Sequence, residues 1–292
     1  MNVNFFVTCI GDALKSRMAR DSVLLLEKLG CRVNFPEKQG CCGQPAINSG
    51  YIKEAIPGMK NLIAALEDND DPIISPAGSC TYAVKSYPTY LADEPEWASR
   101  AEKVAARMQD LTSFIVNTLG VVDVGASLQG RAVYHPSCSL ARKLGVKDEP
   151  LMLLKNVRGL ELLTFAEQDT CCGFGGTFSV KMAEISGEMV KEKVAHLMEV
   201  RPEYLIGADV SCLLNISGRL QREGQKVKVM HIAEGVLSAP VLITGAVVAA
   251  AGVAYGLKKI QANHFMLAGL LGAAFFCLRA SSTCRSVFPV PI

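Results

Sequence analysis

Short apolar runs alternate along the chain with longer amphipathic segments. In the first part of the chain, apolar runs lie at 3–7, 31–35 and 72–75, and helical patterns of apolar residues lie at 13–29 and 52–66. Apolar runs of this length are typical of buried strands, whereas apolar positions spaced three and four residues apart are typical of helices that bury one face. The pattern therefore predicts strands that are joined by helices.

The same order of elements recurs further along the chain. Apolar runs at 131–134, 160–165 and 204–206 predict strands, and the segments 150–157 and 181–200 predict helices. One more helix, which ends near residue 222, and a strand at 227–231 complete this second series. Strands that alternate with helices predict parallel sheets, because each crossover returns the chain in the same direction. The expected fold is α/β, with two tandem, repeated small domains that contain parallel sheets.

The repeat also sets the expected domain boundaries. We expect a first domain at 1–126, a second at 127–236 and a hydrophobic, helical tail at 237–292. The first domain includes a linker, 94–120, that reads as a charged helix followed by an apolar turn.

Eight of the eleven cysteines fall into two equivalent groups, each built around a Cys-Cys-Gly sequence. Set one is Cys9, Cys41, Cys42 and Cys80, and set two is Cys138, Cys171, Cys172 and Cys212. Each cysteine follows a predicted strand or lies on the loop after one, so each set is expected to converge at the carboxyl edge of its own sheet. Four thiolates are the usual ligands of an iron–sulfur cluster. The two sets therefore predict two cluster sites, and Gly43 and Gly173 allow the tight loops that the vicinal pairs need.

Other roles for the cysteines are open at this point. Zinc also takes four thiolates, although structural zinc sites usually use Cys-x₂₋₄-Cys spacing, which this chain lacks. Disulfides are a further alternative that a reducing compartment disfavours. Cys31 has no counterpart in the second repeat, and Cys277 and Cys284 lie in the tail, so we read all three as outside the metal sites.

Composition and charge exclude several classes of protein. Half of the residues are hydrophobic, and all but four of the 30 basic residues precede residue 240, so the body has 26 basic and 28 acidic residues. This balance gives no footprint for nucleic acid. The N-terminus has no pattern of a signal peptide, and the expected location of the body is the cytoplasm. We also find no Gly-x-Gly-x-x-Gly motif after a strand, no P-loop and no catalytic triad motif, so no catalytic residue is predicted.

The two cysteine patterns resemble the cysteine-rich "CCG" domain. That domain occurs, usually twice, in a subunit of heterodisulfide reductase and in iron–sulfur subunits of glycolate oxidase and anaerobic glycerol-3-phosphate dehydrogenase. The two-unit form over about residues 3–236 is most similar to LutA-type lactate-utilisation proteins. Supporting stretches are 39–46, 134–138 and 171–178. The resemblance implies an iron–sulfur electron-transfer subunit of a cytoplasmic complex that oxidises L-lactate to pyruvate, with the substrate-oxidising step in partner subunits.

This chain departs from the family at one position in each repeat. The family pattern often ends in Cys-x-x-Cys, and the first of these two cysteines is replaced by Ala77 and Asp209. Four ligands per set suffice for a [4Fe–4S] cluster, so two such clusters are expected rather than a larger, five-cysteine arrangement. Asp209 is either an additional oxygen ligand or a helix cap. His135, three residues before Cys138, is either a hydrogen-bond donor to a cluster sulfur or a structural turn residue.

Besides a role in lactate oxidation, two other redox functions and one function without electron transfer stay open. The chain could serve a glycolate oxidase-like or heterodisulfide reductase-like complex, or it could be a non-catalytic metal-binding or assembly protein.

The tail has a resemblance of its own. Residues 237–257 contain no charge and are long enough to span a bilayer, so any membrane association would depend on them. The stretch from Met230 to Pro240 is similar to the N-terminus of the membrane component of cobalt energy-coupling transporters. In that family the chain's free amino terminus helps to bind Co²⁺, whereas Met230 is internal, so no cobalt transport is expected. The tail is expected to be either a gene-level fusion or frameshift product or a membrane anchor.

Overall fold

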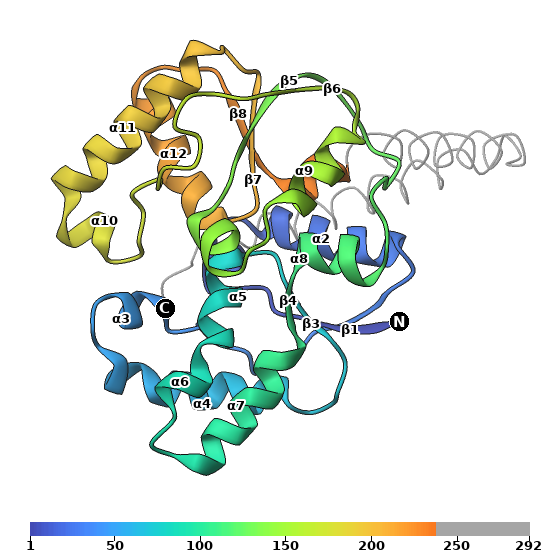
Figure 1. Cartoon of the computed structure of the whole chain (residues 1–292), viewed down its shortest axis with the longest axis vertical. Helices are drawn as coiled ribbons and strands as arrows, with labels where there is room; N and C mark the ends of the chain where they lie inside the picture. The colour runs from blue at the N-terminus through green and yellow to red at the C-terminus, as the bar shows by residue number, and fades with distance from the viewer. Residues whose placement is uncertain (238–292) are drawn as a thin grey trace, which may run out of the picture. The chain divides into compact units, whose positions relative to one another are not determined.

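The computed structural model describes residues 1–237, which form two four-stranded parallel sheets (Figure 1). The strand orders are β2-β1-β3-β4 and β6-β5-β7-β8, so the two sheets have the same topology. The first sheet consists of β1 (Asn2–Phe5), β2 (Arg32–Asn34), β3 (Ile73–Ser75) and β4 (Met108–Asp110). The second consists of β5 (Ser127–His135), β6 (Arg158–Leu163), β7 (Tyr204–Gly207) and β8 (Lys228–His231).

Helices connect the strands of each sheet. Those of repeat one are α1 (Cys9–Leu14), α2 (Ser16–Lys28), α3 (Gln44–Asn48), α4 (Ile52–Leu66), α5 (Gly78–Lys85), α6 (Tyr87–Tyr90), α7 (Pro95–Arg107), α8 (Leu111–Ser113) and the π-helical turn η1 (Phe114–Thr118). Those of repeat two are the π-helical turn η2 (Ser139–Lys143), α9 (Asp148–Lys155), α10 (Phe178–Lys181), α11 (Ala183–Glu199), α12 (Val210–Arg222) and α13 (Ile232–Val236).

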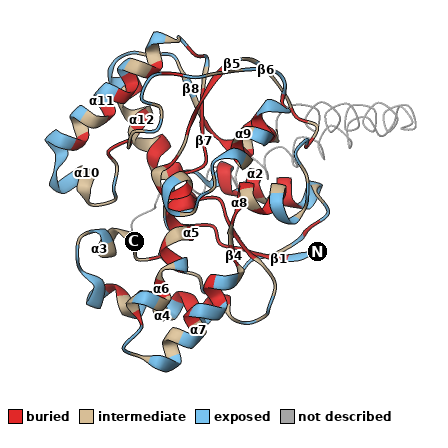
Figure 2. Ribbon diagram, viewed as in Figure 1, coloured by how far each residue is buried: buried red, intermediate tan, exposed pale blue. Residues whose placement is uncertain are grey.

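Strands β1 and β7 are largely buried (Figure 2). Successive strand residues face opposite sides of each sheet and enter different cores. In repeat one, Ile74 joins a central core that both sheets share, whereas its neighbour Ile73 faces the helices α4, α5 and α7. In repeat two, Ile206 joins the central core, and Leu205 faces α11 and α12. The central core binds the two repeats together, and the described residues belong to one compact unit.

The fold agrees with the sequence prediction in class and in most of the predicted elements. It also contains short helices that were not predicted, among them α3, α5 and α6. Two further differences concern the linker and the first predicted helix. In the linker 94–120, the expected charged helix is α7, and a strand that was not predicted, β4, follows it directly. This strand has only three residues, and α8 begins immediately after it. The single helix expected at 13–29 is two helices, α1 and α2, which meet at Lys15. The tail 238–292, with the possible span at 237–257, lies almost wholly outside the described residues. Within residues 1–237, no helix is long and apolar enough to cross a membrane.

His231 closes repeat two and joins it to repeat one. Its Nδ1 accepts a hydrogen bond from the Ala233 N–H at 3.2 Å and caps α13, and its Nε2 lies 2.8 Å from the Pro76 carbonyl oxygen. Since Nδ1 is the acceptor, Nε2 carries the proton and donates it to Pro76. Burial lowers the pKa of His231 from 6.5 to about 4, so the imidazole is neutral at pH 7.

The buried His231 should make the fold sensitive to acid. Between pH 6.5 and about 4 the unfolded chain binds a proton at this residue that the folded chain excludes. The contribution of His231 to stability is therefore fully present above pH 6.5 and is lost as the pH falls toward 4, by about 3 kcal/mol in total. Denaturant unfolding of the wild type and of His231→Asn, which keeps a capping oxygen, should show a weaker loss between pH 7 and 4 in the variant. Parallel pH profiles would contradict this assignment.

Candidate metal centres

The structure brings set one together at the carboxyl edge of the first sheet. Cys9 begins α1 after β1, the vicinal pair lies on the loop after β2, and Cys80 is in α5 after β3. The Sγ atoms of Cys9 and Cys41 are 3.5 Å apart, and those of Cys42 and Cys80 are 3.4 Å apart. These are thiol contacts rather than disulfides, and all nine cysteines among residues 1–237 are free. Cys42 and Cys80 are buried, whereas Cys9 and Cys41 are exposed.

The backbone around set one has an unusual conformation where the thiols are presented. Thr8, directly before Cys9, is buried and has a φ of 68°, a region that residues other than glycine rarely adopt. Its side-chain oxygen accepts from the Gly11 N–H and caps α1. Gly43, directly after the vicinal pair, has a φ of 75°, as the tight loop required. Strained backbone of this kind is common at ligand sites.

Set two occupies the equivalent edge of the second sheet. Cys138 precedes η2 after β5, Cys171 and Cys172 follow β6, and Cys212 is in α12 after β7. Cys172 and Cys212 are buried, and Cys138 and Cys171 are partly exposed. Gly173 has a φ of 81°, and a Cβ there would lie 2.9 Å from the backbone oxygen of Ser186, so the loop leaves no room for a side chain.

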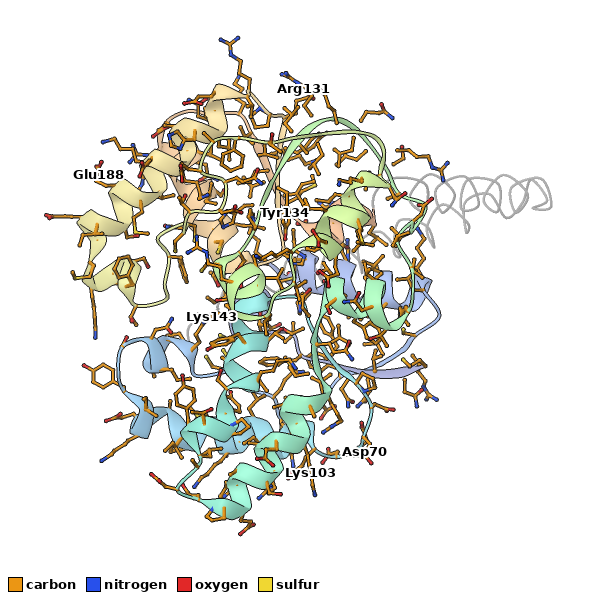
Figure 3. The ribbon with its side chains drawn as sticks, viewed as in Figure 1. Asp70, Lys103, Arg131, Tyr134, Lys143 and Glu188 are labelled. Atoms are coloured by element: carbon orange, nitrogen blue, oxygen red, sulfur yellow. The ribbon has the colours of Figure 1, made fainter. Side chains whose placement is uncertain are left out.

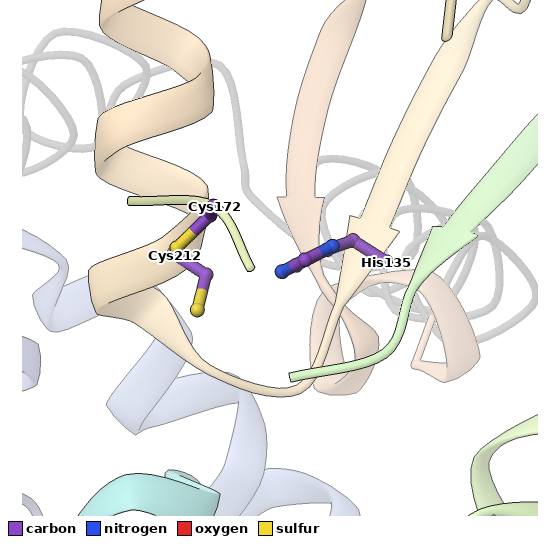
Figure 4. A group of neighbouring side chains, drawn as sticks. All are labelled: His135, Cys172 and Cys212. Atoms are coloured by element: carbon purple, nitrogen blue, oxygen red, sulfur yellow. The ribbon is translucent and has the colours of Figure 1, made fainter. Parts of the chain in front are cut away.

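A histidine accompanies set two (Figure 4). A ring nitrogen of His135, the last residue of β5, and the Sγ atoms of Cys172 and Cys212 all lie within 4.8 Å of one another. His135 is 1% exposed, and within residues 1–237 neither ring nitrogen has a hydrogen-bond partner. Burial, with a smaller effect of Lys193, lowers the pKa of His135 to about 3. A buried polar side chain without a partner is costly, so this imidazole fits a site at which a bound group supplies the partner.

Asp209 is the N-cap residue of α12. Its Oδ1 accepts the Ser211 N–H at 3.1 Å, and its Oδ2 accepts the Ser79 N–H of repeat one at 2.9 Å. Both oxygens of the carboxylate are therefore hydrogen-bonded to backbone amides. Asp209 thus joins the first turns of α5 and α12, the helices that carry Cys80 and Cys212.

The protonation of the thiols also suits a metal. Hydrogen bonds from Cys42 and Cys9 lower the pKa of Cys41, while hydrogen bonds to Cys41 raise the pKa of both Cys9 and Cys42. In set two, the hydrogen bond with Cys171 and burial raise the pKa of Cys138. Closely packed thiols thus share protons and cannot all ionise, unless a cation replaces the protons. Both sites can therefore provide thiolate ligands for a soft metal ion or an iron–sulfur cluster.

The structure therefore brings together every cysteine that the sequence assigned to a set, and leaves Cys31 apart. Cys31 is buried in the central core beside β2 and contacts neither set. The sequence left the role of His135 open, although comparison of the two repeats sets this residue apart. Counting back three residues from Cys9 and Cys138 gives Phe6 in one repeat and His135 in the other. A polar residue at a position that is apolar in the first repeat predicts that the two repeats differ in the surroundings of this side chain.

Comparison with known families agrees with the repeat. The family model described as a cysteine-rich domain, CCG, matches the chain twice, over residues 3–85 and 132–217. These two matches contain the eight cysteines and all or part of the first three strands of each sheet. The chain is thus built from two cysteine-rich domains.

Comparison with whole proteins gives closer relatives. Lactate utilization protein A of Geobacillus kaustophilus (strain HTA426) is 54% identical over 234 residues, which are 80% of this chain and 98% of that protein. Lactate utilization protein A of Bacillus subtilis (strain 168) is 52% identical with the same coverage. A protein of Escherichia coli (strain K12) described as uncharacterized protein YkgE is 98% identical over 238 residues, 82% of this chain and 100% of that protein. The chain belongs to the lactate utilization protein A family.

The tail matches a different family. The model described as a cobalt uptake substrate-specific transmembrane region, CbiM, covers residues 231–283. The start of this match overlaps the described fold, where His231 and Ile232 are buried parts of repeat two. His231 there caps a helix and bonds to Pro76, so its side chain belongs to the α/β core.

Proposed function

We propose that this chain is an iron–sulfur electron-transfer subunit of a complex that oxidises L-lactate to pyruvate. The observation that carries the proposal is the convergence of two equivalent sets of four free cysteines in a chain that is 52–54% identical to lactate utilization protein A over nearly the whole of those relatives.

The proposed ligands are the eight cysteines of the two sets, and the proposed cofactors are two [4Fe–4S] clusters. When bound, such clusters accept and release single electrons. The residues present fit this group: each set offers four free thiols, two of them buried, at one sheet edge. The carboxylate of Asp209 is used in capping, so we propose the cysteines, and not Asp209, as ligands.

Contacts from neighbouring side chains hold the proposed ligand loops in place. The buried cysteine of each vicinal pair is fixed through its backbone: Tyr87 donates its hydroxyl to the Cys42 carbonyl at 2.8 Å, and Asn215 donates its amide to the Cys172 carbonyl at 2.7 Å. We propose that the oxidation of lactate takes place in partner subunits, as the resemblance to lactate-utilisation proteins implies. Iron–sulfur subunits of glycolate oxidase- or heterodisulfide reductase-like complexes are the second candidate, because the CCG domain is shared with them.

Growth on different carbon sources tests the assignment to lactate. A strain that lacks this gene should lose growth on L-lactate but keep growth on glycolate and glycerol. Expression of the wild-type chain should restore growth, and so should Cys31→Ser, whose thiol lies outside both sets. A defect confined to glycolate or glycerol would assign the chain to one of the alternative complexes instead.

We also propose that residues 237–292 come from a gene-level fusion or frameshift. Relatives of 52–98% identity are matched over 98–100% of their length by at most 238 residues of this chain, and a transporter family matches residues 231–283. Resequencing the locus tests this. An uninterrupted single reading frame in independent isolates would favour a membrane anchor instead.

A further inference from the structure

The two cysteine sets differ at one buried position. Phe6 and His135 each lie three residues before the first cysteine of their set, and both are at most 1% exposed. Strand pairing places them equivalently, because Phe5 pairs with Ile74 in the first sheet and Tyr134 pairs with Ile206 in the second. Phe6 packs in one apolar cluster with Cys42 and Cys80. The corresponding side chain beside Cys172 and Cys212 is an imidazole.

The imidazole of His135 lies beside the thiols of Cys172 and Cys212. Figure 4 shows the ring directed from the end of β5 toward Cys172 and Cys212. A neutral imidazole has one N–H donor and one acceptor nitrogen, and here both nitrogens are buried without a partner within the described chain. Four cysteines already saturate a cluster, so the ring is not required as a ligand. A thiolate sulfur that binds iron is an acceptor that would satisfy the N–H.

Two lysine side chains lie near set two. Lys193 of α11 is 1% exposed, donates hydrogen bonds to the Gln168 and Glu167 carbonyls at 2.9 and 3.3 Å, and interacts electrostatically with Cys172 and Cys212. Lys143 of η2, labelled in Figure 3, interacts with Cys138 and lies 4.4 Å from the centre of the Tyr82 ring.

We propose that His135 donates a ring N–H to a metal-bound sulfur of set two, and that the centre on set two therefore has a higher reduction potential than the centre on set one. The inference rests on the proposed function, because it requires clusters on both sets. Reduction adds negative charge to a cluster, and a hydrogen bond to sulfur stabilises that charge. The apolar ring of Phe6 gives set one no such stabilisation. His135 is a positioning and tuning residue, and the two centres are inequivalent despite their common fold.

Potentiometric titration followed by EPR spectroscopy tests this on the full-length protein purified without oxygen. Signals are assigned to each centre with Cys42→Ser and Cys172→Ser. The wild type should show two midpoint potentials, with that of set two the higher. His135→Phe, which copies repeat one, should lower the potential of set two and leave set one unchanged. His135→Gln, which keeps an N–H donor, should retain most of the difference, and the mirror variant Phe6→His should raise the potential of set one.

The outcomes separate this inference from the proposed function. If the wild type holds no iron and sulfide, the proposed function fails before any potential is measured. If His135→Phe keeps its full iron content and both potentials are unchanged, the hydrogen bond is absent and the inference is overturned. Loss of iron from set two in His135→Phe and His135→Gln alike would make His135 a ligand, which also contradicts it. Should His135→Phe fail to fold, Phe6→His alone carries the test.

Discussion

Replacing Cys172 by serine should remove the cluster of set two and halve the iron and sulfide content of the protein. Cys172 is 2% exposed, packs with Cys212 in the core of repeat two, and has its carbonyl held by Asn215. A serine hydroxyl is a hard, protonated oxygen and a poor substitute for a thiolate at iron. One EPR signal should disappear, and the variant should fail to restore growth on lactate. Cys42→Ser is the matched change in repeat one and should remove the other signal.

Cys31→Ser is the control for burial. Cys31 is also buried, at 6% exposure, but lies in the central core away from both sets. This variant should keep both signals and its full iron content, with at most a modest loss of stability. Equal iron loss in Cys31→Ser and Cys172→Ser would show that the metal content reports general unfolding rather than ligation.

Replacing Gly78 by alanine should lower the free energy of unfolding by about 1–3 kcal/mol, the usual cost of overpacking. Gly78 begins α5, and a Cβ there would lie 2.7 Å from Leu140 Cβ and 3.1 Å from Leu140 Cα. Leu140 belongs to η2 in repeat two and is fully buried, so its backbone has to shift to admit the methyl group. Cys80 lies two residues further along α5, so this shift should also make the cluster of set one more labile.

Gly58→Ala is the matched control for this substitution. Gly58 lies within α4, and nothing lies within 4 Å of the position that its Cβ would occupy. There alanine should stabilise the helix by up to about 1 kcal/mol. Chemical denaturation of both variants gives the comparison. A Gly78→Ala variant as stable as Gly58→Ala would show that the two repeats do not pack against each other as described.

The sequence predicted individual helices and strands better than it predicted the contacts between the two repeats. Helix α4 was expected over the residues that form it, because its apolar spacing is a local feature. Strand β4 was missed, because three residues directly after a helix carry too little periodicity to be recognised. Only its pairing with β3 defines it.

In the candidate site, too, local features could be predicted from the sequence and long-range contacts could not. Spacing alone grouped cysteines that the fold brings close together, because each follows a strand and parallel strands end at one edge. The bond from the Ser79 N–H to Asp209 links residues 130 positions apart, and the bond from His231 to Pro76 spans 155 positions. No local pattern encodes such contacts. The environment of His135 likewise depends on how β5 packs against α12 and the vicinal loop, which only the folded structure defines.

The most direct test of the central claim is iron and acid-labile sulfide analysis of the protein purified without oxygen. Two [4Fe–4S] clusters on the two sets predict about eight iron and about eight sulfide per chain, with EPR signals that vanish one at a time in Cys42→Ser and Cys172→Ser. Stoichiometric zinc without sulfide would contradict the account, because the two cysteine sets would then be structural metal sites with no capacity for electron transfer.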